Sequence, residues 1–431
     1  MRIFVTGQCT LHWGRLEYGN IGNYYVVEPL FKELHRVFPN AEIVTTFQMS
    51  DDFIKREKIS VLPMELYYSW KDNDLEIAQK EYEIAKEYST TGILNGTTPY
   101  IQEILKCDLF IDFSGDMWGK NADLAGENRF LIGILKDRVA QLLNKKTVMF
   151  LGSPGPFSDK NLDLAKETFK KFDLITLREP VSKTLLVDWG FDISKVKNCA
   201  CQSVLFEAAK QNEIKTIINN TALEAKNNPI IGFTICGWNM EKGPFNRNDY
   251  DDIEFNNFVE IIKLCCEELN AKVCLFSHSN GFELPPNFKL INGRDYKLIQ
   301  QVYDIVQKQN WAKDKVFILD KICLPKEIKA VIQNFDMLIS GRVHGAIAGL
   351  SSCVPTVIID YGHEPKAHKL QGFAKLYDIE RFIANPKDYN DMRKKSKECF
   401  ENRTKVRKEL EIQVPIIKLL AQKSTNLLKE L

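Results

Sequence analysis

The chain has 431 residues, of which 44% are hydrophobic and 27% are charged, and its formal net charge is +1. This composition is globular, and the length predicts about two domains with cores large enough to fold without added cross-links. The balanced charge gives no sign of the strongly basic composition of many nucleic-acid-binding proteins, so no nucleic-acid partner is expected.

Short, almost continuously apolar runs recur along the chain and predict strands buried on both faces of a parallel sheet. The first series is Ile3–Thr6, Ile43–Thr46, Leu109–Phe113, Thr147–Leu151 and Leu174–Leu177. The second series is Ile230–Ile235, Lys272–Phe276, Val316–Leu319, Met337–Ile339 and Thr356–Ile359. Between many of them lie helix-like segments such as Arg129–Leu143, Ile253–Leu269 and Lys297–Gln307. This alternation predicts two doubly wound, Rossmann-like α/β domains that face a cleft.

A polar segment ending in the turn signal Asn227-Asn228-Pro229 separates the two series. We therefore predict an N-terminal domain at 1–206, a linker at 207–229, a C-terminal domain at 230–390 and a helical segment at 391–431. That last segment contains basic clusters at 393–397 and 403–408. Such clusters predict a solvated helix face or, alternatively, loose contact with an anionic membrane surface.

The eleven cysteines predict a reducing compartment. None forms a Cys-x-x-Cys pair, and several lie inside apolar runs, which is typical of buried reduced thiols. The N-terminus has no signal-peptide pattern, and no run approaches the roughly 18 apolar residues of a membrane-spanning helix. We expect a cytoplasmic protein with at most peripheral membrane contact.

Ligands of parallel sheets bind beyond the carboxyl ends of the strands, so the strand-to-helix turns hold the candidate site residues. The segment Gly19–Asn23 offers backbone N–H groups, with Asn20 and Asn23 beside them, or is a plain turn before a helix at Tyr24–Val37. The turn Phe113–Gly119 places Ser114, Asp116 and Trp118 after a strand, either as cleft residues or as a helix cap.

Two further turns carry cationic or titratable side chains. Arg178 emerges from a strand end just before Pro180, where a guanidinium can hold a carboxylate or phosphate or form a surface pair with Glu179. His278 follows the strand at Lys272, and a lone histidine at such a place is either structural or a site residue.

The most informative stretch is Ser-Gly-Arg-Val-His-Gly, from Ser340 to Gly345. It joins a strand to a helix of small residues, Ala346–Leu350, whose positive dipole end can face an anion. Arg342 beside His344 therefore suggests an anionic substrate and proton transfer. Lys366 and Lys369 follow the next strand and add positive charge.

No metal site is expected. His363 and His368 are five residues apart with Pro365 between them, whereas the helical zinc motif needs a spacing of four.

These residues resemble the polysaccharide pyruvyl transferase family. Ser340–Lys369 is similar to the family pattern of Arg-x-His, a small-residue helix, a proline, a strand, a tyrosine and a nearby lysine. Gly19–Gly22, Asp108–Asp116, Thr176–Pro180 and Phe276–His278 agree more loosely and occur in the family's order.

The resemblance implies a fold like that of the B-type glycosyltransferases. It also implies transfer of the pyruvyl unit of phosphoenolpyruvate onto two hydroxyls of a sugar in surface polysaccharide biosynthesis, with release of phosphate. By this similarity Arg178 and Arg342 bind the donor, together with a lysine of the C-terminal domain that is either Lys366 or Lys369. The similarity also implies that His344 is catalytic. Asp116 or His278 would deprotonate a hydroxyl.

Phosphoenolpyruvate is then a co-substrate, no cofactor is implied, and the partner is a saccharide acceptor, free or lipid-linked. Asn23, the Phe113–Asp116 turn and the residues added at 362–365 depart from the family pattern. The acceptor is therefore not defined by sequence, and neither is the oligomeric state. Two alternatives share the expected architecture: a glycosyltransferase that uses a nucleotide sugar, and a non-catalytic sugar-binding protein.

Overall fold

The computed structural model describes residues 1–8, 14–120, 128–218, 228–241, 243, 249–361 and 367–431. The chain forms two compact units. The first consists of Met1–Leu16, Glu28–Gln202 and Leu419–Leu431, and the second of Glu17–Val27 and Ser203–Lys418. Helix α1 (Ile21–Val37) and helix α15 (Arg403–Asn426) therefore each contribute residues to both units.

The first unit is built on a seven-stranded parallel sheet with the strand order β3-β2-β1-β4-β5-β6-β7. All five strands predicted for this half are present, and the short edge strands β3 and β7 are additional. The strands are β1 (Arg2–Thr6), β2 (Glu42–Thr45), β3 (Ser60–Val61), β4 (Leu109–Asp112), β5 (Lys146–Gly152), β6 (Leu174–Leu177) and β7 (Val196–Asn198).

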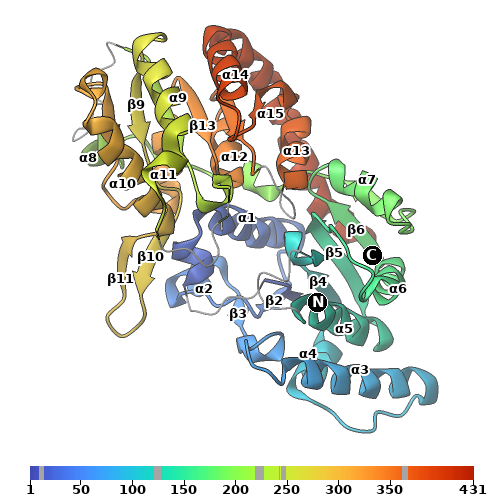
Figure 1. Cartoon of the computed structure of the whole chain (residues 1–431). Helices are drawn as coiled ribbons and strands as arrows, with labels where there is room; N and C mark the ends of the chain where they lie inside the picture. The colour runs from blue at the N-terminus through green and yellow to red at the C-terminus, as the bar shows by residue number, and fades with distance from the viewer. Residues whose placement is uncertain (9–13, 121–127, 219–227, 242, 244–248, 362–366) are drawn as a thin grey trace. The chain divides into compact units, whose positions relative to one another are not determined.

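Helices connect these strands, as the parallel order requires (Figure 1). They are α2 (Asp51–Glu57), α3 (Asp74–Thr91), α4 (Pro99–Lys106), α5 (Arg129–Leu142), α6 (Leu162–Lys171) and α7 (Val181–Asp188), besides α1. One core cluster is rich in aromatic rings and has Trp118 in it, 1% exposed, together with Phe130, Phe157, Phe169 and Phe191.

The second unit is built on a six-stranded parallel sheet with the order β12-β9-β8-β13-β14-β15. The five strands predicted for this half are present, and β15 is additional. They are β8 (Ile230–Thr234), β9 (Lys272–Leu275), β12 (Val316–Ile318), β13 (Met337–Ser340), β14 (Thr356–Ile359) and β15 (Ile383–Ala384). The strand order reverses between β8 and β13, and such a switch point is where open parallel sheets bind ligands.

Helices again lie between these strands, and α8 precedes the first strand while α14 follows the last. They are α8 (Lys215–Ile218), α9 (Asn256–Glu267), α10 (Arg294–Gln307), α11 (Pro325–Ile332), α12 (Val343–Ser351), α13 (Ala367–Leu376) and α14 (Tyr389–Glu401). The helical prediction for the C-terminal segment is met by α14 and α15. None of the helices in the described ranges combines the length and apolarity needed to cross a bilayer.

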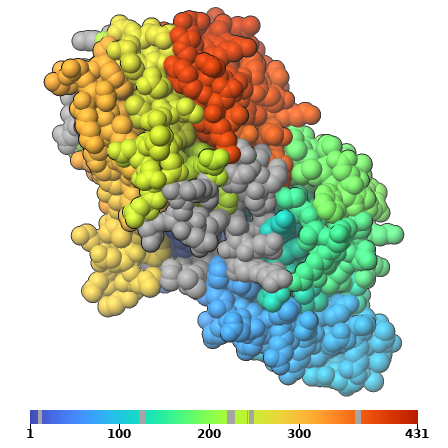
Figure 2. Space-filling model, in the orientation of Figure 1, coloured from blue at the N-terminus to red at the C-terminus, as the bar shows by residue number. Residues whose placement is uncertain are grey.

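Two local features differ from the sequence-based expectation. Gly22 and Asn23 lie inside α1 instead of in a turn before it, because the helix starts at Ile21. An antiparallel hairpin, β10 (Asn280–Glu283) with β11 (Lys289–Asn292), follows the turn that carries His278. It is the gold patch at the lower left of Figure 2.

Candidate active site

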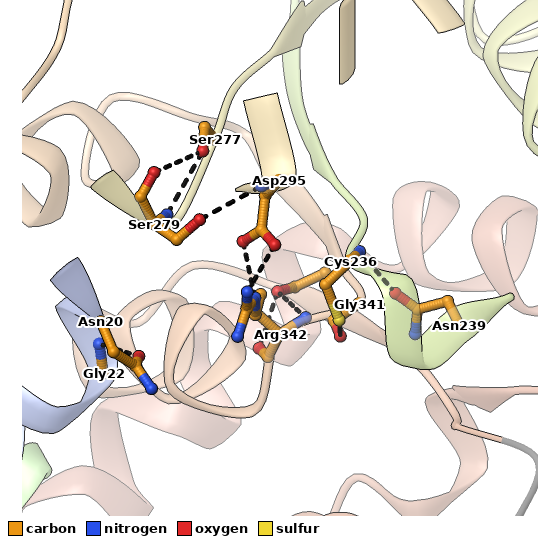
Figure 3. A network of polar contacts seen from close by, with 10 residues as sticks. Asn20, Gly22, Cys236, Asn239, Ser277, Ser279, Asp295, Gly341 and Arg342 are labelled. Atoms are coloured by element: carbon orange, nitrogen blue, oxygen red, sulfur yellow. Dashed lines mark hydrogen bonds and ion pairs between the residues drawn. The ribbon is translucent and has the colours of Figure 1, made fainter. Parts of the chain in front are cut away.

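The centre of the candidate site in the second unit is an ion pair between Arg342 and Asp295 (Figure 3). Arg342 Nε donates to Asp295 Oδ2 at 2.7 Å, and Nη2 donates to Oδ1 of the same carboxylate. Arg342 is 8% exposed and Asp295 is 0% exposed. A planar guanidinium that meets a carboxylate through two parallel hydrogen bonds is held in one orientation, and only Nη1 points elsewhere.

The backbone around Arg342 is fixed by the end of β13. Ser340 Oγ accepts from the Arg342 N–H at 3.2 Å and donates to the Arg342 carbonyl at 2.9 Å. Arg342 is the N-cap residue of α12, with extended backbone angles. A side chain at Gly341 would overlap the amide of Asn239, so glycine is required there. The Ser340 hydroxyl therefore stabilises the turn before α12 through the backbone of Arg342, and the Arg342 side chain takes no part in these hydrogen bonds.

Asn239 connects the turns after β8, β13 and β14. Its Oδ1 accepts from the Cys236 N–H at 2.8 Å, and its Nδ2 donates to the carbonyls of Ile359 and Asp360, both at 3.3 Å. Cys236 in turn donates from Sγ to the Gly341 carbonyl at 3.1 Å. The switch point between β8 and β13 is thus tied together by hydrogen bonds from buried side chains.

Asp295 stays ionised in spite of its burial. Burial alone would raise the pKa of this carboxyl, but the Arg342 and Arg294 guanidinium groups and Ser279 outweigh it and hold the pKa below its ordinary value. Arg294, the first residue of α10, has its own pKa lowered by Arg342 nearby. Two arginines therefore face one carboxylate, which leaves positive charge at this place.

The turn after β9 supports Asp295. Ser277 Oγ donates to the Ser279 carbonyl at 2.8 Å and accepts from the Ser279 N–H at 3.3 Å. Ser279 Oγ then accepts from the Asp295 N–H at 3.3 Å. The start of α10 is in this way attached to the segment that carries His278.

His344 is the second residue of α12, so its imidazole lies at the positive end of the helix dipole. Its ring centroid is 6.4 Å from that of Phe373 on α13. The backbone of α1 lies against it at Gly22, where an added Cβ would be 2.6 Å from His344 Nδ1. His344 is half-buried, and no bulkier residue than glycine fits beside it.

His278 is in a different environment. Its ring is 1% exposed and meets the Tyr25 ring edge-on, with centroids 5.4 Å apart. Among the described residues, its Nε2 has no hydrogen-bond partner. Burial and the nearby charge of Arg342 lower its pKa to about 3, so the imidazole is neutral. It lies close to α12, where a Cβ added at Gly345 would be 3.5 Å from its Cδ2.

The first unit holds the other predicted cation, Arg178, which is 7% exposed. Its Nε donates to Ser153 Oγ at 2.8 Å, and its Nη2 is 3.9 Å from Asp116 Oδ1. Gly115 has φ +64 and lies beside the guanidinium. A Cβ added at Gly115 would be 3.4 Å from Arg178 Nη1. Arg178 and Asp116, from the turns after β6 and β4, are therefore brought together.

The remaining residues of that turn are bound internally. Ser114 donates to Asp112 Oδ1 from both its N–H, at 2.8 Å, and its hydroxyl. Trp118 donates from Nε1 to Asp137 Oδ2 at 3.2 Å and is packed in the aromatic core. Burial raises the pKa of both Asp112 and Asp137. These contacts assign Ser114 and Trp118 a part in holding the turn.

Of the other residues singled out from the sequence, Asn20 caps α1, accepting from the Gly22 N–H at 3.1 Å. Asn23 lies in the first turn of that helix. Lys369 lies in the first turn of α13. Lys366 and His363 fall outside the described residues. In the described ranges, no cluster of three or more His, Cys, Asp or Glu side chains is arranged to hold a metal ion.

Sequence reasoning missed Asp295 and Asn239, and it singled out Gly19–Asn23 without predicting the contact of Gly22 with His344. Asp295 carried one signal, because acidic residues are enriched in the first turn of a helix. Its pairing with Arg342, 47 residues away, had none.

A family model described as polysaccharide pyruvyl transferase matches residues 20–363. A search of curated proteins found no match. Among solved structures, Anabaena HepE in complex with UDP and glucose has a TM-score of 0.57 at 12% identity, with 100% of both chains covered.

Two further structures have the same fold. A glycosyltransferase from Rickettsia africae has a TM-score of 0.57 at 12% identity, covering 100% of this chain and 98% of its own. The UDP-GlcNAc 2-epimerase from Neisseria meningitidis, bound to UDP-GlcNAc, has a TM-score of 0.56 at 12% identity, with 100% of both chains covered. At this identity the likeness shows the fold alone, and it confirms the prediction of Rossmann-like domains of the B-type glycosyltransferase class.

Proposed function

The chain belongs to the polysaccharide pyruvyl transferase family, and from that premise we propose that it transfers the pyruvyl unit of phosphoenolpyruvate to two hydroxyls of a saccharide. The products are a cyclic pyruvate ketal and inorganic phosphate. The observation that carries this proposal is the placement of Arg342 and His344 at the N-terminus of α12, beside the switch point of the second sheet.

The donor carries a carboxylate and a phosphate, so it requires fixed positive charge. Arg342 offers Nη1, since Asp295 takes its other two donor nitrogens, and Arg294 adds a second guanidinium nearby. The α12 N-terminus adds backbone N–H groups. By family resemblance, Arg178 and Lys366 or Lys369 contribute further cations.

The proton balance suits a single histidine. Protonated His344 gives a proton to the vinyl carbon of the donor, which becomes a methyl group, and the neighbouring carbon becomes oxocarbenium-like. The first sugar hydroxyl attacks that carbon, and its proton passes to the imidazole that His344 left neutral. The second hydroxyl displaces phosphate, and its proton leaves with the phosphate. The net reaction thus moves two hydroxyl protons, one to the methyl group and one to the phosphate.

Two residues were candidates for deprotonating a hydroxyl, and their surroundings differ. His278 is buried with a pKa of about 3, which makes it a weak base without access to solvent. Asp116 is more exposed and lies beside Arg178. We therefore favour Asp116, which would take the proton of the second hydroxyl and pass it to the departing phosphate, and give His278 the role of packing near α12.

Calorimetric titration of phosphoenolpyruvate into the full chain tests the donor assignment. We expect binding that weakens at least about tenfold in Arg342→Lys, because lysine cannot reproduce the bidentate geometry. Binding should persist in His344→Asn, which removes the acid while keeping much of the side-chain volume. Pyruvate and inorganic phosphate serve as ligands that carry only one of the donor's two anionic groups.

The same titration with UDP and UDP-glucose tests the alternative, a glycosyltransferase that uses a nucleotide sugar. That alternative rests on the fold alone, which is shared by enzymes of several activities. Heat released by UDP, together with no response to phosphoenolpyruvate, would reject the pyruvyl transfer and favour the alternative.

A further inference from the structure

We propose that the exposed face of α15 docks the protein on an anionic lipid bilayer. The feature behind this is an apolar stripe on that helix, which we define as Ile412, Pro415, Ile416 and Leu419. Ile412 is 70% exposed, Ile416 50% and Leu419 67%, and Pro415 is also exposed. The spacing of three and four residues places all four on one side of the helix.

The stripe is not the side by which α15 packs on the protein. That side carries the buried residues Val406, Leu410, Val414, Ile417 and Ala421. At about 3.6 residues per turn the two rows lie on opposite sides of the helix. A helix that is attached to its protein along one apolar row normally presents polar residues on the other side. Here the outer side is apolar as well, which calls for a second partner.

Lysines mark both ends of the stripe. Lys405 and Lys408 precede it and Lys423 follows it on the same side of the helix, while Lys418 lies on its flank, and all four are exposed. Two acidic residues lie in the same stretch. Glu411 is exposed, and Glu409 forms an ion pair with Arg381 at 2.6 Å and a longer one with Lys405 at 3.9 Å. The outer face is therefore apolar along its middle and positively charged at its ends.

An anionic bilayer fits this arrangement better than a second copy of the chain. Apolar side chains of an interfacial helix enter the boundary between headgroups and acyl chains, and lysines reach the anionic headgroups around them. Two copies of the same face would bring their lysines together, which is unfavourable. Three large side chains are also few compared with the roughly 20–30 residues a side of a stable dimer.

Flotation of the full chain with vesicles tests the proposal. We expect binding to vesicles of phosphatidylglycerol and phosphatidylethanolamine, no binding to pure phosphatidylcholine, and release at about 0.5 M salt, where charges are screened. The variant Ile412→Ser/Ile416→Ser/Leu419→Ser should reduce the bound fraction at least tenfold. The variant Lys408→Glu/Lys423→Glu should do the same while keeping the apolar stripe.

Ile253→Ser is the matched control, because Ile253 is 73% exposed and lies on a different helical turn. It should float like the wild type. Failure of the wild type to float with the anionic vesicles, or equal loss in Ile253→Ser, would overturn the proposal. It would also be overturned if light scattering found a stable dimer that the triple serine variant converts to monomer, since the stripe would then contact a second copy.

Discussion

The backbone of Gly22 in α1 lies directly against the imidazole of His344 in α12. A Cβ at Gly22 would be 2.6 Å from His344 Nδ1, 2.8 Å from its Cβ and 2.9 Å from its Cγ. The two residues are far apart in sequence, and the absence of a side chain on one sets the position of the ring on the other.

We expect Gly22→Ala to destabilise the protein by about 1–3 kcal/mol, since the new methyl group forces the imidazole or α1 to shift. In a His344→Gly background both the ring and the Cβ that the new methyl group would meet are gone, and the same substitution should become neutral or stabilising by up to about 1 kcal/mol through helix propensity. Urea unfolding of the four proteins of this double-mutant cycle measures the difference. Equal effects in both backgrounds would show that the contact does not exist.

A second prediction concerns the Arg342–Asp295 pair. Asp295→Asn leaves a buried guanidinium without its counter-charge, and we expect a loss of roughly 3–5 kcal/mol in the free energy of unfolding. The exposed pair Arg381–Glu409 is the matched control, and Glu409→Gln should cost less than about 1 kcal/mol. Chemical denaturation at neutral pH compares the two, and a similar small loss in both would contradict the burial of the first pair.

His278 should make stability depend on pH in the mildly acidic range. Its folded pKa of about 3 lies below the ordinary value of about 6.5, so only the unfolded chain takes up the proton between these values. The contribution of neutral His278 to the free energy of unfolding is therefore complete above about pH 6.5, and it decreases as the pH is lowered. In His278→Gln we expect the change in unfolding free energy between pH 7 and pH 5.5 to shrink by about 1 kcal/mol. Parallel slopes for variant and wild type would refute this.

Lys329 should make stability depend on pH in the neutral to alkaline range. It is 3% exposed and donates to the Phe206 carbonyl at 2.6 Å, and burial together with Lys418 lowers its pKa to about 7. Above that pH the folded side chain is neutral while the unfolded one is still charged, so stability rises with pH. Thermal unfolding at pH 7 and pH 9 should show a gain of up to about 2 kcal/mol that Lys329→Met removes.

Much of the fold follows from the sequence because strands buried on both faces are apolar throughout. All ten predicted runs are strands of the two sheets. The strands that escaped prediction are the short edge pieces β3, β7 and β15, with two or three residues each, and the hairpin β10–β11. Such pieces are too short for a hydrophobic period, and their pairing depends on neighbours already in place.

The site was predicted where local rules apply and missed where long-range packing decides. The ends of parallel strands placed Arg178, His278 and Arg342 correctly in strand-end turns, whereas His344 lies inside α12, which begins at Val343 and not at the expected Ala346. Nothing near Arg342 in sequence indicates that its charge is paired with Asp295. Trp118 lies in a polar turn, yet its ring completes an aromatic core formed by residues from α5, α6 and their flanking loops.

The buried thiol of Cys236 is a chemical probe of local opening near Arg342. It lies 0% exposed beneath the turn that carries Arg342, donates to the Gly341 carbonyl, and has its pKa raised by burial. An alkylating reagent reacts with the thiolate and so must wait until this turn opens. The rate of Cys236 modification therefore measures how often the strand-end turn opens. Any ligand bound by Arg342 would make this opening rarer and the modification slower.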